Sequence, residues 1–176
     1  MLNFKKKISL TSLDEEQNII SKKISELKPV KGFSQFVLYA ISELFANINE
    51  HSKAKNAFIE LKIDKEKCLI KISDDGKGLR KSYNQNKIYP KDDFSAIEFA
   101  LSGLSTKNFR ERGFGLYSVK KLALALGGEM VIESGKAKAT IQKENIKFNH
   151  LKKDIKGLSI TLKTNVREIN FYKHME

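Results

Sequence analysis

Apolar residues between Phe36 and Ile48 recur at steps of three and four over about four helical turns. This spacing predicts an amphipathic helix, because it gathers the apolar side chains on one face. The remaining face carries Glu43, Asn47 and Glu50. Since residues four apart project from the same side of a helix, Glu43 and Asn47 should lie together, one turn apart.

A β-hairpin should follow this helix. Residues 57–63 and 68–73 alternate apolar and polar side chains, and the polar segment 64–67 lies between them. That pattern is typical of two antiparallel strands joined by a turn. The second strand runs directly into Asp74-Asp-Gly-Lys-Gly78, so a carboxylate and a glycine turn should stand at its end.

The other segments are also patterned. Residues 79–112 form the least regular part, and so long a loop inside a compact domain is usually functional or mobile. A second helix should begin at Gly113-Phe-Gly115 and stop at Gly127-Gly128. The remaining expected elements are a strand at 4–11, helices from Ser12 to Pro29 and at 94–102, and strands at 129–134, 138–147 and 157–163, the last two separated by the polar stretch 148–156.

Length and composition suit a single domain over residues 1–176, of which 40% are hydrophobic. No apolar run approaches the ~20 residues needed to span a bilayer, and no apolar region follows the basic N-terminus as it would in a signal peptide. The one cysteine, Cys68, alternates with apolar residues and should be a core thiol. We therefore expect a cytoplasmic protein without a membrane partner.

The net charge of +12 has two interpretations, a nucleic-acid surface or a lysine-rich surface that also favours anionic phosphates. The lysines are dispersed along the chain without a long basic run, and aromatic residues are not interleaved with them. Nucleic-acid binding is therefore not favoured as the main function.

Glu43 and Asn47 carry groups suited to nucleotide chemistry. A carboxylate can take a proton from water or orient it, and an amide oxygen can ligate Mg²⁺, which shares its shell with phosphates. The plainer alternative is a solvated pair on an amphipathic helix.

The two glycine turns each have a functional and a plain interpretation. Asp74 could accept a hydrogen bond from an exocyclic amine while Gly76 and Gly78 let the backbone approach a ligand, or the segment is a simple Asp-Gly turn. Gly113-x-Gly115 could offer backbone N–H groups and a helix N-terminus to a phosphate, or merely cap its helix. The basic residues just upstream that could add charge are Lys107, Arg110 and Arg112.

Taken together, three motifs resemble the N, G1 and G2 boxes of the GHKL (Bergerat-fold) ATPase superfamily: Glu43-Leu-Phe-Ala-Asn47, Asp74-x-Gly76-x-Gly78 and Gly113-x-Gly115-Leu116. Their order and the elements between them agree with that superfamily over residues 34–163. The surroundings of Asn47 and the segment 117–128 look most like bacterial histidine kinases and anti-sigma-factor kinases. The resemblance implies an α/β fold, a two-layer sandwich in which helices pack on one face of a mixed β-sheet.

The resemblance also implies roles for individual residues, with ATP and Mg²⁺ as cofactors. Glu43 matches the general base of members that hydrolyse ATP, and Asn47 matches the Mg²⁺ ligand. Asp74 matches the aspartate that reads adenine, with Gly76 and Gly78 shaping its pocket. The further nucleotide contacts implied by the lid and its end are Ser105, Thr106, Lys107, Arg112, Gly113, Phe114, Gly115 and Leu116. A late-strand hydroxyl often completes the adenine pocket, and both Thr140 and Ser159 are open for that role.

The chain departs from the family pattern at three places. Many histidine kinases carry Lys or Arg where this chain has Glu50, which moves a phosphate contact elsewhere, for example to Lys53, Lys107 or Arg112. The last strand begins Gly157-Leu-Ser rather than Gly-Thr. Residues 136–156 are longer than a minimal member needs.

The resemblance implies an Mg-ATP-binding regulatory domain that phosphorylates or sequesters a partner protein, such as a response regulator, a sigma factor or an anti-sigma antagonist. None of the three histidines follows an acidic motif on a long upstream helix, so a complete sensor kinase is not expected. A slow ATPase switch that drives an oligomer change, with a homodimer as one form, and a non-catalytic scaffold stay open as alternatives.

Overall fold

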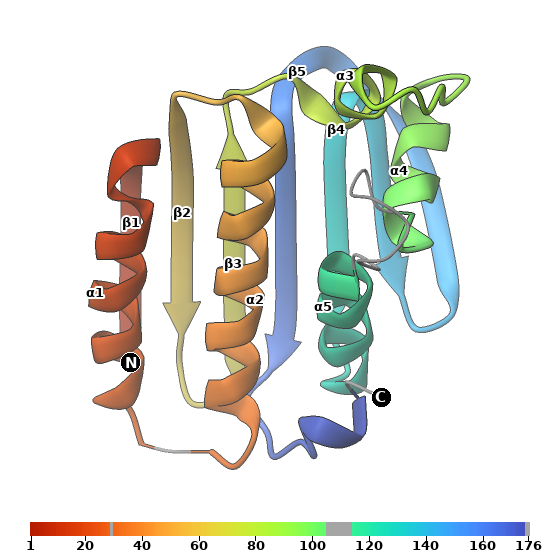
Figure 1. Cartoon of the computed structure of the whole chain (residues 1–176). Helices are drawn as coiled ribbons and strands as arrows, with labels where there is room; N and C mark the ends of the chain where they lie inside the picture. The colour runs from red at the N-terminus through yellow and green to blue at the C-terminus, as the bar shows by residue number, and fades with distance from the viewer. Residues whose placement is uncertain (29, 105–113, 175–176) are drawn as a thin grey trace.

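The computed structural model describes residues 1–28, 30–104 and 114–174. Helices lie on one face of a five-stranded sheet, so the expected two-layer α/β sandwich is confirmed (Figure 1). The elements are β1 Leu2–Ser9, η1 Leu10–Ser12, α1 Leu13–Ser25, α2 Phe33–Asn47, η2 Ile48–Ser52, β2 Asn56–Ile63, β3 Lys67–Asp74, α3 Gly78–Gln85, α4 Asp93–Leu101, α5 Phe114–Ala125, β4 Glu129–Gln142, β5 Asn145–Asn165 and η3 Tyr172–His174.

The sheet order is β1-β2-β3-β5-β4, and its four strand pairs are all antiparallel. We expected a mixed sheet, and this detail was wrong. The chain leaves β3, passes through three helices and returns in β4, which runs in the same direction as β3. The β4–β5 hairpin then places β5 between these two parallel strands, so each neighbour in the sheet is antiparallel.

The core lies between the sheet and the helices. α2 contributes its whole predicted stripe, and Phe36, Val37 and Ala40 are completely buried. The facing strands bury alternate residues, as a half-covered sheet requires. The prediction for Cys68 is confirmed, because it is 2% exposed in this core and burial raises the pKa of its thiol to about 12.

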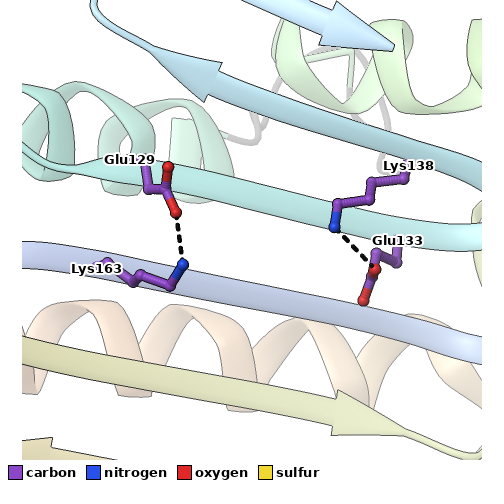
Figure 2. A network of polar contacts seen from close by, with 4 residues as sticks. All are labelled: Glu129, Glu133, Lys138 and Lys163. Atoms are coloured by element: carbon purple, nitrogen blue, oxygen red, sulfur yellow. Dashed lines mark hydrogen bonds and ion pairs between the residues drawn. The ribbon is translucent and has the colours of Figure 1, made fainter. Parts of the chain in front are cut away.

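The opposite face of the sheet is polar. Figure 2 shows two ion pairs on β4 and β5, Glu129 with Lys163 at 2.7 Å and Glu133 with Lys138 at 3.7 Å. Glu129 and Lys163 are direct cross-strand partners. Solvent-exposed pairs of this kind contribute about 0–1 kcal/mol each, so they shape this face more than they stabilise the fold.

Two segments differ from the sequence-based expectation. The segment 138–156 was expected to be one strand at 138–147 and a polar stretch at 148–156, but it contains the end of β4, a turn and the start of β5. β4 continues through an irregularity at Gly135 to pair with β5. α3 was not expected, because it buries only Ser82 and Tyr83 and therefore has no apolar stripe. None of the described helices combines the length and apolar character needed to cross a membrane.

Candidate functional site

The structure places the described parts of the three motifs along one continuous stretch of chain, α2 and η2. A side chain at Gly115, in the first turn of α5, would overlap Oε2 of Glu43 on α2. A side chain at Gly76 would overlap the carbonyl oxygen of Ser52, which accepts a hydrogen bond of 2.9 Å from the backbone N–H of Lys77. The helix that carries Glu43 and Asn47 therefore contacts α5 on one side and, through η2, the turn after Asp74 on the other.

Asp74 ends β3 with a buried carboxylate that is 5% exposed. Its Oδ1 accepts a 2.7 Å hydrogen bond from the backbone N–H of Gly76, and the backbone N–H of Leu158 also donates to the carboxylate. Burial raises the pKa of Asp74, the charge of Asp75 raises it further, and the two backbone donors oppose the shift. A desolvated carboxylate fixed by backbone donors is suited to accept a hydrogen bond from a ligand amine.

The adjacent Asp75 has a different task. Its carboxylate accepts hydrogen bonds from the backbone N–H groups of Lys55 and Asn56, at 2.8 and 3.0 Å, and from the side-chain amide of Asn56 at 2.7 Å. These bonds, above all the one from the Asn56 side chain, lower the pKa of Asp75 to about 2. Asp75 therefore ties the turn to the start of β2.

Close backbone approach around Asp74 depends on Gly157, which sequence reasoning did not include in the site. Gly157 has φ +80°, and a side chain there would overlap the carbonyl oxygen of Asp74 and lie 2.7 Å from its Oδ1. Gly78 is constrained mainly by its backbone, which has φ +76°; an added Cβ would make a tight contact of 3.0 Å with Oγ of Ser134.

Ser134 on β4 is a second residue that sequence reasoning missed. Its hydroxyl is 3% exposed, accepts a hydrogen bond from the N–H of Leu79 at 3.0 Å and donates to the carbonyl of Gly157 at 3.3 Å. It therefore links β4, β5 and the start of α3 beside Asp74. The sequence alone does not show that Ser134 lies beside Asp74. That position follows from the register between β4 and β5, which places Ser134 opposite Leu158.

Replacing Ser134 with alanine should lower the free energy of unfolding by about 1–2 kcal/mol, because it leaves the Leu79 N–H and the Gly157 carbonyl without this partner. Affinity for the adenine nucleotide that the motif resemblance implies should also fall several-fold, since Gly157 contacts Asp74. Thermal unfolding and calorimetric titration measure the two effects. The matched variant Ser73→Ala, on the polar face of β3, should change neither, and equal losses in both variants would contradict the linking role.

The structure does not bring Thr140 to this group. Thr140 lies opposite Lys147 on the β4–β5 hairpin, six residues past Ser134, or roughly 20 Å of extended strand. The alternative, Ser159, pairs with Ser73 and Glu133 on the polar face of the sheet. Both hydroxyls thus lie away from the Asp74 carboxylate.

The surroundings of Glu43 include two further hydroxyls. Tyr39 lies one turn before Glu43 on α2 and hydrogen-bonds Ser118 of α5, which is 4% exposed. Burial raises the pKa of Tyr39, and the charge of Glu43 adds to this shift. Asn47 is half-buried at the end of α2, where the helix continues into the π-turn η2, a geometry often found at functional sites.

The chemistry of these side chains fits Mg²⁺ bound together with phosphates. No group of three or more His, Cys, Asp or Glu side chains gathers within the described parts of the chain in a way that could hold a metal by itself. Mg²⁺ is commonly held by one or two protein oxygens, waters and substrate phosphates, which the amide of Asn47 near Glu43 would satisfy. Lys53 and Lys77 lie close to each other beside the Asp74 turn. Burial lowers the pKa of Lys77, and the positive charge of Lys53 lowers it further.

Several predicted contacts lie outside the described residues, namely Ser105, Thr106, Lys107, Arg112 and Gly113. α5 begins at Phe114, whose side chain is also outside the description. Leu116 is half-buried and packs against the core.

The comparison with models of protein families points to one family. The model of a family described as histidine kinase-, DNA gyrase B-, and HSP90-like ATPase matches residues 33–155. Among solved structures, the chain is similar to the mycobacterial sensor histidine kinase MprB, with 15% sequence identity, a TM-score of 0.44 and coverage of 93% of this chain and 100% of that one. A search of curated protein sequences finds no match.

Proposed function

Since the chain belongs to the histidine kinase-, DNA gyrase B- and HSP90-like ATPase family, we propose that it binds Mg-ATP around Asp74 and regulates a partner protein. The observation that carries this proposal is that one stretch of chain, α2 with η2, contacts Gly115 through Glu43 and the Asp74 turn through Ser52. The Asp74 turn and the N-terminus of α5 therefore both border the stretch that carries the amide oxygen of Asn47.

In the proposed complex, Asp74 accepts a hydrogen bond from the exocyclic amine of adenine. Gly76, Gly78 and Gly157 allow the turn and the start of α3 to pack closely around Asp74, which holds its carboxylate in place for the base. The first turn of α5 offers backbone N–H groups to the phosphates. Asn47 supplies an oxygen to Mg²⁺, which neutralises phosphate charge.

We assign to the site the transfer of the γ-phosphoryl group to a side chain of a signalling partner, or sequestration of that partner in a nucleotide-dependent way. In-line transfer requires mainly positioning and charge neutralisation, which Mg²⁺ bound by Asn47 and the N-terminus of α5 would support. The partner classes that fit are a response regulator, a sigma factor and an anti-sigma antagonist.

Calorimetric titration with ATP tests the binding step, with Mg²⁺ present and absent. Binding should require an adenine base, so GTP should give no comparable heat, and Mg²⁺ should tighten ATP. A thermal shift offers a second readout, because ligand at 100 times its Kd stabilises the fold by about 2.7 kcal/mol. If millimolar ATP gives neither binding heat nor a change in melting temperature, the non-catalytic scaffold is the better explanation of the fold.

A second function, slow ATP hydrolysis that switches an oligomer, is favoured by the position of Glu43 against the first turn of α5. If Glu43 activates water, Glu43→Gln should reduce phosphate release by about 10²–10⁴-fold while ATP affinity changes little. The control is Glu50→Gln, whose side chain is 40% exposed beside His51. Unchanged phosphate release in Glu43→Gln would remove this carboxylate from the mechanism.

A further inference from the structure

The β4–β5 hairpin continues past the sheet as a two-stranded ribbon, which we define as residues 136–156 (Figure 1). β3 pairs with β5 only as far as Ser73 opposite Ser159. Beyond that point β4 and β5 pair with each other, from Ala137 opposite His150 to Gln142 opposite Asn145. The ribbon contributes no residue to the proposed ATP site.

One face of the ribbon is anchored on α4. Ala137, Ala139 and Ile141 are buried. The ring of Phe94 on α4 meets Phe148 at 5.9 Å and His150 at 4.6 Å between centroids, both edge-on. The carboxylate of Asp93 accepts a 2.9 Å hydrogen bond from the N–H of Lys136. These contacts with α4 therefore hold the ribbon in place.

The other face of the ribbon points to solvent and carries no acidic side chain. The cross-strand register places on it Lys138, Thr140, Gln142, Asn145, Lys147 and Asn149. This face itself carries two lysines, Lys138 and Lys147, and the ribbon as a whole holds seven lysines against two acidic residues, or +5 of the net charge of +12.

We propose that this face of the ribbon binds duplex DNA. The major groove of B-DNA, about 12 Å wide, admits a two-stranded ribbon, and lysine, asparagine and glutamine are the side chains that contact its phosphates and base edges. Phe148 and His150 pack against Phe94, so stacking on unpaired bases does not fit. The deep, narrow major groove of A-form RNA does not admit such a ribbon.

This inference does not rest on the proposed ATP site: the ribbon adjoins that site only at its base, next to Gly157, and the six residues of this face lie beyond the base. Near the base, Lys138 is paired with Glu133 in the absence of DNA (Figure 2). Binding would exchange that weak surface pair for a phosphate contact. Each phosphate neutralised releases counterions, so affinity should fall steeply with salt.

Fluorescence anisotropy of the full chain with a labelled duplex of about 24 base pairs tests the proposal at low salt. The test variant is Lys138→Gln with Lys147→Gln, and the matched control is Lys28→Gln with Lys65→Gln, two exposed lysines elsewhere. The ribbon variant should bind roughly tenfold more weakly near 0.1 M salt and lower the slope of log affinity against log salt by about 2. The control should change affinity less than threefold.

Thermal unfolding and ATP titration of both variants should match the wild type, which separates lost DNA contacts from misfolding. Equal weakening in both variants would assign DNA affinity to net charge and overturn the ribbon assignment. Duplex RNA bound as tightly as DNA would overturn the groove argument. No binding to DNA at 50 mM salt, or tighter binding to poly-glutamate of equal charge, would overturn the proposal in favour of an acidic protein partner.

Discussion

Replacing Asp74 with asparagine is expected to weaken ATP binding by roughly 100-fold, or about 2.7 kcal/mol, without destabilising the folded chain. The amide keeps the size of the side chain and can still accept the Gly76 N–H. It loses the charge, however, and one of its terminal groups becomes a donor that faces the donor amine of adenine. Calorimetric titration with ATP and Mg²⁺ measures the change.

The stability of this variant follows from the direction of the pKa shift. Burial raises the pKa of Asp74, so above its unfolded value folding must desolvate a charge. At neutral pH, Asp74→Asn should therefore unfold at the same temperature as the wild type or a higher one. The difference should vanish as the pH falls below about 3.9, where the unfolded wild-type carboxyl is itself neutral.

Asp75→Asn is the matched control, one residue away. The pKa of Asp75 is lowered to about 2, so its carboxylate stabilises the fold above the unfolded value of about 4, and this contribution is lost as the pH falls towards 2. The variant should therefore be less stable at neutral pH but keep its ATP affinity within about threefold. Equal loss of ATP binding in both variants would contradict a specific role for the Asp74 carboxylate.

These contrasts also show how far the sequence could predict the molecule. α2 and α5 were predictable because their apolar residues keep a helical period, and β2 and β3 because theirs alternate. α3 was not, since Ser82 and Tyr83 are its only buried residues. Residues 148–156 were not predicted as part of a strand. One face of the ribbon is exposed to solvent and the other packs on α4, and no local sequence pattern shows that contact.

The site residues were predictable where spacing within one helix or one turn fixes their positions. They were not predictable where the pairing of two strands fixes them. Glu43, Asn47 and Asp74 were found from spacing along one helix and from a strand followed by glycines. The late-strand hydroxyl was sought at Thr140 or Ser159 by residue type alone. Ser134 occupies the position beside Gly157 because β4 and β5 pair with Ser134 opposite Leu158, and only the three-dimensional pairing fixes that register.

The largest effect on stability is expected from Gly157→Ala. The residue has φ +80°, and the added methyl group would overlap the carbonyl oxygen of Asp74. That oxygen is part of the backbone at the end of β3. It cannot move away from the methyl group as the end of a flexible side chain could. The variant should lose about 3–4 kcal/mol of unfolding free energy and should fail to bind ATP, because relief of the overlap displaces Asp74.

Gly103→Ala separates backbone strain from this overlap. Gly103 has nearly the same φ, +79°, but the nearest atom to an added Cβ is Cβ of Tyr117 at 3.9 Å, an ordinary contact. Its alanine variant should therefore show only the left-handed backbone penalty of about 1–2 kcal/mol and retain ATP binding. Chemical denaturation of both variants measures the difference. If they are equally destabilised and bind ATP equally well, the packing of Gly157 on Asp74 does not hold the site in place, and the carboxylate must be positioned by its hydrogen bonds to Gly76 and Leu158 alone.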